Sequence, residues 1–415
     1  MSASTPARKP ALGFIFVTVV LAVLGFGLLI PVLPELVKQF RGHDVSAGSH
    51  AYGWLVSVYA FMQFFGSPIL GSLSDRFGRR KVILIALAGS SLDFVVMALA
   101  PSLTILFVAR MVGGLTAGVL ATANAYVADV TPAEKRAQGF GLLGAAFGIG
   151  FIIGPLIGGV LGSVDLRLPF WAAAGCSALN WCYGFFVLPE SLAPENRRAF
   201  SWKRANPVGA LLALKRFPAV LGLAESYFIL TLAQMMLFSI WALYTNYRYH
   251  WDTQHVGFSL MLVGVMSAIV QAGLAKRIIG RLGDTRGVIL GLVLSATAQV
   301  LYGLAPQGWM VYYIILVGSF AGIAGPAMQS YITKHVPPNE QGSVQGIYSG
   351  LASLAGIPGP LLATWSFSWA VRPGQPAWLA GITFFIAATL ALIALALAAR
   401  SFAQDHAPYV APVHS

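Results

Sequence analysis

The sequence predicts an all-α integral membrane protein with twelve transmembrane helices in two pseudo-symmetric six-helix bundles. Of its 415 residues, 57% are hydrophobic and only 10% are charged, whereas an ordinary soluble domain carries roughly 25% charged residues. At roughly 20 residues for each membrane-spanning helix, the apolar residues suffice for about twelve spans. A soluble surface needs far more charge and a disordered chain has the opposite composition, so both classes are excluded.

Twelve mainly apolar runs, separated by charged or Pro- and Gly-rich turns, give the positions of the spans. Runs this long and continuous favour helices, because the strands of a membrane β-barrel are short and alternate apolar with polar residues. The predicted spans are 12–34, 53–73, 82–100, 103–127, 138–162, 169–188, 218–246, 255–275, 288–305, 309–332, 344–369 and 377–399. They define an N-terminal tail (1–11), one bundle (12–188), a central loop (189–217), a second bundle (218–399) and a C-terminal tail (400–415).

The Lys and Arg residues orient these spans. Most of the 26 fall in loops on one side of the layout, and cytoplasmic loops are the ones enriched in positive charge. The other side holds only Lys38, Arg41, Arg167, Arg248 and Arg372. We therefore expect a multi-pass protein of the cell membrane, in bacteria the inner membrane, with both termini in the cytoplasm. The net charge of +12 then reflects topology and contact with the lipid bilayer, and no nucleic-acid partner is expected.

The two halves also resemble each other in sequence. Short segments after the second span, in the fourth span and in the fifth span recur at an offset of 205 to 209 residues in the second half. The matching pairs are residues 71–75 with 280–284, residues 126–132 with 331–338, and residues 154–155 with 359–360. Two parallel six-helix halves with a binding site between them are typical of secondary transporters.

The segment after the second span carries the first mechanistic signal. Its pattern, G-x-x-x-D-R-x-G-R-R, resembles the loop signature of the major facilitator superfamily, and the resemblance implies a gating latch. The residues are Gly71, Asp75, Arg76, Gly78, Arg79 and Arg80, with Asp284 as the repeat counterpart of Asp75. We expect the small Gly71 to let helices approach closely and Asp75 to meet the positive N-terminus of the third span. The alternative is that the basic residues only fix topology.

A second signal lies in the fifth span, where glycines recur at four-residue spacing around a proline. Such glycines make a smooth helix face for tight contact, and a proline kinks the helix. The residues are Gly150, Gly154, Pro155, Gly158 and Gly159. The pattern resembles the glycine-proline signature of the drug:proton antiporters, which implies export. The alternative is the ordinary packing of any polytopic protein.

Charged residues inside a membrane are costly, so each one is a functional candidate. Asp93 in the third span and Arg110 in the fourth lie about eight residues from the turn at Pro101, hence at similar depth, and an ion pair between them is possible. Its role is either proton or substrate coupling or the structural pairing of two helices. Glu225, near the cytoplasmic start of the seventh span, is a further candidate for proton coupling, although its side chain can reach the membrane surface.

Uncharged polar and aromatic residues at mid-span are candidates for a substrate cavity. In members of the superfamily, the first, second, fourth and fifth helices of each half line that cavity. The resemblance therefore favours Gln63, Asn124, Gln234, Gln271 and Gln329 over Gln299 in the ninth span, and Trp241 is an aromatic candidate for the same cavity.

The sequence contains no motif that is typical of an enzyme active site or of a metal site. Cys176 and Cys182 form no CxxC pair, no nucleophile elbow is present, and no G-x-x-x-x-G-K-[ST] loop for ATP occurs. We expect no cofactor and no metal. The expected partners are a small-molecule substrate, protons and the bilayer, with the monomer as the functional unit.

Nearly the whole chain resembles the tetracycline-efflux members of the drug:proton antiporter branch. Those members carry acidic residues in the first and ninth spans, where this chain has Ala22 and Ser295, whereas Asp93 and Arg110 match the family's embedded acid and arginine. The resemblance implies export of a small lipophilic or amphipathic compound, tetracycline being one candidate, in exchange for protons by alternating access. The alternatives are a facilitator or importer of a small metabolite without proton antiport, and a transporter-like receptor.

Overall fold

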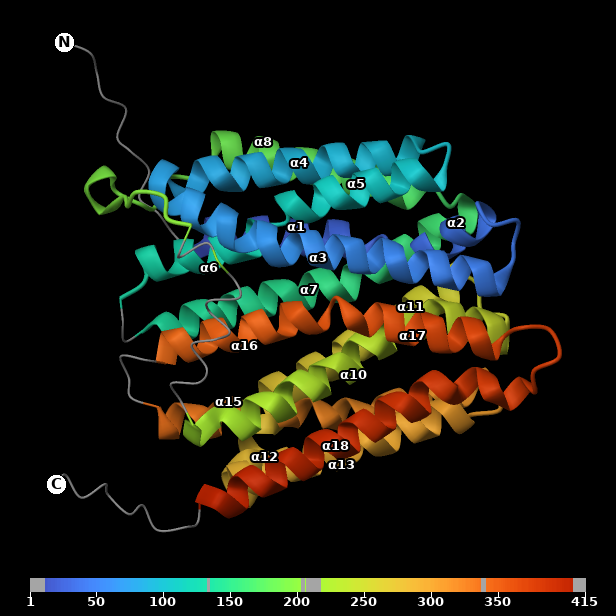
Figure 1. The fold of residues 1–415 in the computed structure, drawn as a ribbon. Coiled ribbons are helices and arrows are strands. Elements are labelled where there is room, and N and C mark those ends of the chain that lie inside the picture. The colour runs from blue at the N-terminus through green and yellow to red at the C-terminus, as the bar shows by residue number, and fades with distance from the viewer. Residues whose placement is uncertain (1–11, 133–134, 203–205, 207–217, 337–340, 406–415) are drawn as a thin grey trace.

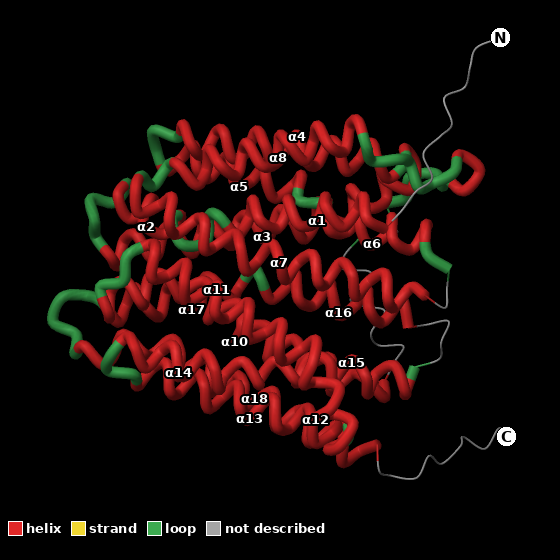
Figure 2. The backbone as a smooth tube through the Cα atoms, turned by 180° about the vertical axis from the view of Figure 1, so that it is seen from behind, coloured by secondary structure: helices red, strands yellow, loops and turns green. Residues whose placement is uncertain are grey.

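The structure, a computed structural model, describes residues 12–132, 135–202, 206, 218–336 and 341–405. Three predicted segments lie wholly or partly outside these residues. They are the N-terminal tail (1–11), residues 203–205 and 207–217 of the central loop, and residues 406–415 of the C-terminal tail. Every regular element within them is a helix (Figures 1 and 2). The all-α prediction is therefore confirmed.

The first half of the chain folds into six membrane passes. They are α1 (Leu12–Gly27) with α2 (Leu33–Gln39), α3 (Val45–Phe77), α4 (Arg79–Leu99), α5 (Leu103–Thr116) with α6 (Val119–Val130), α7 (Arg136–Val164) and α8 (Leu168–Phe186). Two passes are interrupted. The first breaks just before Pro31, whose ring prevents a continuous helical ladder, and the fourth breaks at Ala117, whose carbonyl accepts a hydrogen bond from the Ser67 hydroxyl at 2.9 Å.

The second half repeats this arrangement after a short 3₁₀ turn, η2 (Pro194–Asn196). Its passes are α10 (Pro218–Tyr249); α11 (Thr253–Ile269), the π-turn η4 (Val270–Leu274) and α12 (Ala275–Leu282); α13 (Asp284–Leu304); α14 (Gly308–Gly318), η5 (Ser319–Ile323) and α15 (Ala324–His335); α16 (Gln341–Ala355) and α17 (Pro358–Ala370); and η6 (Ala377–Gly381) with α18 (Ile382–Asp405).

The membrane character of these helices agrees with twelve passes. Among the described residues, nine helical segments are long and apolar enough to cross a bilayer, and α1 and α11 are shorter apolar helices. The remaining pass is α8, whose 19 residues include Asn180 and two tryptophans. Because the number of passes is even, the start of α1 and the end of α18 lie at the same end of the molecule (Figure 1).

The repeat is more regular in the structure than in the sequence. A shift of 205 residues carries α4 onto α13, and it carries Gly78 (φ +100°) onto Gly283 (φ +81°), the two glycines that precede these helices. Only glycine adopts such a positive φ without strain. The counterpart of Asp284 is therefore Arg79, and the sequence-based pairing of Asp284 with Asp75 is wrong. The sequence comparison matched the acidic residues Asp75 and Asp284, whereas the positions that correspond in the structure are the turn glycines Gly78 and Gly283.

The two halves meet along a contact surface that we call the far-end seam. It lies at the end of the molecule opposite the loops before α4 and α13, and we call the end with those loops the basic end. Here α7 packs on α11 and α3 packs on α17. Hydrogen bonds across the seam in the described part of the chain include Lys38 Nζ to Asn246 Oδ1 (2.9 Å), Ser46 Oγ to Ser368 O (2.9 Å), Ser57 Oγ to the Ile357 carbonyl (2.8 Å) and Thr253 Oγ1 to the Gly159 carbonyl (3.0 Å).

A cross-link tests this closed seam. In a Cys176→Ser and Cys182→Ser background, Ser46→Cys with Ser368→Cys should form a disulfide on mild oxidation, because the two hydroxyl oxygens lie 2.8 Å apart. The measurement is a non-reducing gel after cleavage at a protease site inserted between the two halves. Each single cysteine variant serves as the control, and separation of the fragments in the double variant would contradict the seam.

Candidate functional site

Asp93 on α4 and Arg110 on α5 form a buried ion pair, with Arg110 Nη2 donating to Asp93 Oδ2. Each residue is 4% exposed. Their second polar atoms, Asp93 Oδ1 and Arg110 Nε, have no hydrogen-bond partner among the described residues. A charge in such surroundings is tolerated only beside its partner, so the protonation of Asp93 and the position of Arg110 depend on each other.

The guanidinium of Arg110 also touches α3, the helix that carries part of the far-end seam. Its Cζ lies 4.8 Å from the centre of the Tyr59 ring, within the range of a cation–π interaction. Two residues before Tyr59, Ser57 donates its hydrogen bond to the Ile357 carbonyl across the seam. The ion pair is thus joined to the seam through a short stretch of α3.

The other acidic candidates lie elsewhere. Glu225 is exposed on α10, away from the ion pair, and at the positions of the expected family acids Ser295 is buried and Ala22 is half-buried. One turn beyond Ser295, Gln299 is 3% exposed and its Oε1 has no partner in the described part of the chain. Among the residues that the structure describes, Asp93 is the only buried Asp or Glu.

The predicted gating loop is organised around Arg79, the first residue of α4. Its guanidinium pairs with Asp75 at 2.6 Å and with Asp129, at the end of α6, at 2.9 Å, and it donates to Ser74 Oγ at 2.6 Å. Asp75 therefore reaches the start of α4 through Arg79. The explanation offered for Gly71 is wrong, because a Cβ there would meet nothing within 4 Å. The neighbouring Arg76 lies over the Phe77 ring, and Arg80 donates to the Gly184 and Phe185 carbonyls at the end of α8.

Glu190, just after the sixth pass, caps α4 from a distant part of the sequence. Its Oε1 accepts backbone hydrogen bonds from Arg79 (2.8 Å), Ser191 (3.0 Å) and Leu192 (3.1 Å). The Arg198 N–H adds a bond to the Asp75 carbonyl at 2.9 Å. Glu190 and Asp129 were not predicted from the sequence, although the position of Asp129 within the repeated segment 126–132 indicates a structural role.

The second half has a related contact with its charges reversed. Asp284, the counterpart of Arg79, pairs at 2.5 Å with Lys334, which the same 205-residue shift makes the counterpart of Asp129. The Lys334 side chain is 63% exposed, so this pair contributes only about 0–1 kcal/mol. The first half therefore holds the stronger of the two contacts.

The glycine-proline face of α7 serves two helices. Gly150 and Gly154 pack against the backbone of α1, Gly158 packs against the backbone of Leu28 just beyond α1, and Gly159 packs against α11. A Cβ on Gly159 would lie 2.5 Å from the Thr253 carbonyl and 3.0 Å from Gly257 Cα. Pro155 lies within the continuous helix α7, and its carbonyl faces Gly257. The motif residue Gly159 thus belongs to the far-end seam itself.

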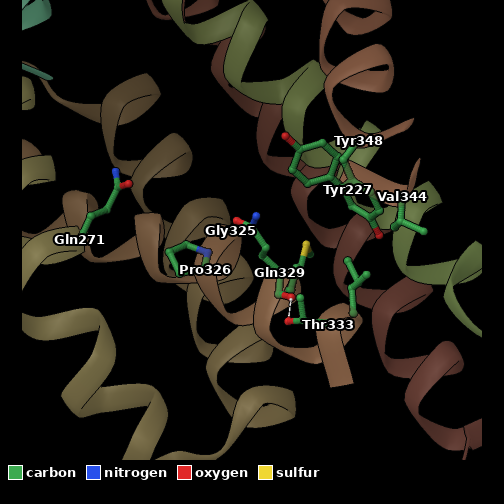
Figure 3. Close-up of a pocket in the computed structure, with 10 residues that line it drawn as sticks. Tyr227, Gln271, Gly325, Pro326, Gln329, Thr333, Val344 and Tyr348 are labelled. Carbon is green, nitrogen blue, oxygen red and sulfur yellow. Dashed lines mark hydrogen bonds between the residues drawn. The ribbon is translucent and has the colours of Figure 1, made fainter. Parts of the chain in front are cut away.

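A pocket of about 250 Å³ lies in the half of the second bundle nearer the basic end. It is lined by α10, η4, α15 and α16 (Figure 3), which belong to the first, second, fourth and fifth passes of that half. Two predicted cavity residues, Gln271 and Gln329, line it together. Its other lining residues are Tyr227, Gly325, Pro326, Met328, Ile332, Thr333, Val344 and Tyr348.

The remaining predicted cavity residues lie outside this pocket. Asn124, the counterpart of Gln329 under the 205-residue shift, is exposed on α6, and Gln63 and Gln234 are half-buried. Trp241 is 4% exposed and donates from Nε1 to Ser259 Oγ at 2.9 Å. Its indole packs in the core beside Tyr302.

The sequence profile described as Major Facilitator Superfamily matches residues 15–360 and 223–413. The chain is 37% identical over 385 residues to the tetracycline resistance protein, class C, of Escherichia coli, which covers 93% of this chain and 95% of that protein.

Two solved structures share the fold. The human organic anion transporter MFSD10 (TETRAN) superposes with a TM-score of 0.71 at 27% identity, covering 95% of this chain and all of the other. A bacterial homolog of the human lysosomal transporter Spinster superposes with a TM-score of 0.78 at 16% identity, covering 95% and 97%.

The geometry of the gating loop predicts the effect of a single methyl group. Gly78→Ala should disrupt the loop, because the residue has φ +100° and the new Cβ would overlap the Glu190 carboxylate. A residue with a Cβ that is forced into this conformation costs about 1–3 kcal/mol before any clash. The measurement is thermal unfolding of the purified protein. Gly71→Ala, where space is open, is the matched control, and equal stability of the two variants would contradict the geometry.

The buried ion pair predicts non-additive stability. Arg110→Gln should destabilise the protein by about 3–5 kcal/mol, because it leaves a buried carboxylate without its partner. Adding Asp93→Asn should recover much of that loss. Unfolding in mixed detergent and dodecyl sulfate measures both variants, with exposed Arg372→Gln as the control for loss of an arginine. Additive losses would show that the two side chains do not interact.

Proposed function

The chain belongs to the major facilitator superfamily of membrane transporters, and from this premise we propose that it exports a small lipophilic or amphipathic compound in exchange for protons. Similarity to a tetracycline resistance protein over 93% of the chain supports drug export and makes tetracycline a candidate substrate. The observation that carries proton exchange is the buried Asp93–Arg110 pair.

In this proposal the basic end faces the cytoplasm and the transporter works as a monomer. The far-end seam is closed in this conformation, while the pocket with Gln271 and Gln329 lies toward the basic end. A compound from the cytoplasm or the inner leaflet would enter there. Alternating access then requires the seam to open and contacts near the basic end, including the gating loop around Arg79, to rearrange.

The coupling step is a proton moving onto Asp93 from the outer side. Protonation makes the carboxyl neutral and removes most of its attraction for Arg110. This step takes place while the seam is open, and the compound leaves to the outside. Arg110 then shifts on the Tyr59 ring, and α3 transmits that shift to the hydrogen bond between Ser57 and Ile357, which re-forms as the protonated protein closes the seam. Release of the proton to the cytoplasm then restores the ion pair. Glu225, exposed on α10, is a second place at which a proton can be held.

A carrier without antiport, either a facilitator or an importer of a small metabolite, is the second candidate. The observation that favours it is the absence of an acid at Ala22 and Ser295, where tetracycline-efflux members of the family carry one. Under this alternative, the Asp93–Arg110 pair only joins α4 to α5.

Proton movement distinguishes the two functions. Everted membrane vesicles carrying an acid-inside pH gradient should release protons when tetracycline or another exported compound from a drug panel is added. Asp93→Asn should abolish that release while the protein remains folded. Asp252→Asn is the matched control, because Asp252 is an exposed helix cap at the far end and Asn caps helices equally well. Substrate movement without proton release would favour the carrier.

A further inference from the structure

The pocket between α10, η4, α15 and α16 has a lining without charge. None of its ten lining residues is acidic or basic. Half of them present a hydroxyl or an amide, and the other half are glycine, proline or apolar residues. Transfer of a net charge into such surroundings costs several kcal/mol unless a counter-charge is present, so the lining discriminates against ions.

The charges nearest in sequence do not supply a counter-charge to the pocket. Glu225 is two residues from Tyr227 on α10, and residues two apart on a helix point in nearly opposite directions. Asp284 and Lys334 line an adjoining pocket, but they pair with each other at 2.5 Å. Lys276 is the remaining charged residue among those described around the adjoining pocket, and its positive charge opposes the entry of other cations.

The polar groups of the pocket are placed for a neutral ligand. Gln271 lies in the π-turn η4, a type of irregularity that often marks functional positions. Gln271, Gln329, Tyr227 and Tyr348 come from four separate segments and surround the same space (Figure 3). The Tyr348 hydroxyl is buried and has no hydrogen-bond partner within the described residues. The centroids of the Tyr348 and Tyr227 rings lie 4.7 Å apart.

We propose that this pocket binds an uncharged, ring-containing compound through amide and hydroxyl groups, and that it rejects permanent cations. The inference rests on the proposed function, since it names the substrate class that the exporter takes. The two tyrosine rings supply flat apolar surfaces, and Gln271, Gln329 and the Tyr348 hydroxyl supply donors and acceptors. At about 250 Å³ the pocket is small, below the roughly 300–1,000 Å³ of drug-sized sites, so it holds a small compound or one part of a larger one.

A matched pair of probes tests the charge preference. 4-Phenylpyridine N-oxide is neutral and accepts hydrogen bonds, while N-methyl-4-phenylpyridinium has the same two rings and a permanent positive charge. Equilibrium binding of each to the purified full-length protein in lipid nanodiscs needs no proton coupling. We expect the wild-type protein to bind the N-oxide at least about tenfold more tightly than the pyridinium, a difference of about 1.4 kcal/mol.

Two variants connect this preference to the pocket. Gln271→Glu, measured at pH 8 so that the carboxyl is ionised, should shift the ratio about tenfold or more toward the pyridinium. Gln375→Glu, the same change on an exposed far-end loop, should leave it unchanged. Tyr348→Phe should weaken N-oxide binding about two- to tenfold by removing one hydrogen bond. If Gln271→Glu does not fold, Gln329→Glu makes the same test from α15.

The outcomes separate this inference from the proposed function. Equal binding of both probes by the wild-type protein, no binding of either, or an unchanged ratio in both Gln→Glu pocket variants would overturn the neutral pocket. Proton release from everted vesicles on addition of other compounds would still support the exporter in each of those cases. Conversely, selective N-oxide binding without any proton release would support the pocket and remove the antiport.

Discussion

The buried ion pair between Asp93 and Arg110 controls how the first half of the molecule is assembled. A bilayer interior offers no water to either charge, so α4 and α5 must keep the two side chains together. Gly113 packs directly against the Asp93 carboxylate, and Gly114 packs against the Tyr59 carbonyl on α3. A single charged contact therefore fixes three helices, and one of the three forms part of the seam between the halves.

The seam itself is built from small residues and single hydrogen bonds. Gly159 and Gly257 let the α7 and α11 backbones approach closely, and Ser46, Ser57 and Thr253 each donate to a carbonyl of the other half. Bonds of this kind contribute roughly 1 kcal/mol each. A contact surface made in this way can open and close at modest cost, as the proposed alternating access requires, while the charged loop around Arg79 holds the opposite end of the first half together.

Much of this arrangement could be predicted from the sequence. The bilayer requires apolar residues wherever a helix crosses it, and it favours positive charge in the cytoplasmic loops. The twelve passes and the proximity of Asp93 to Arg110 followed from run lengths and equal depth. The break at Ala117 did not, since no proline or polar run marks it and a side-chain hydrogen bond from α3 stabilises it. The role of Glu190 could not be predicted, because its hydrogen bond to the Arg79 N–H forms only when α8 packs on α4. Asp284 was paired with the wrong residue, because only the backbone reveals which glycine makes the turn.

The central claim is that Asp93 holds the exchanged proton. It is tested most directly by adding the exported compound to the purified protein in weakly buffered detergent solution, near the pH at which the site is half protonated, and measuring the protons released. The account predicts release of a proton on binding by the wild-type protein and none by Asp93→Asn that still binds the compound. Undiminished proton release from the Asp93→Asn protein would contradict it.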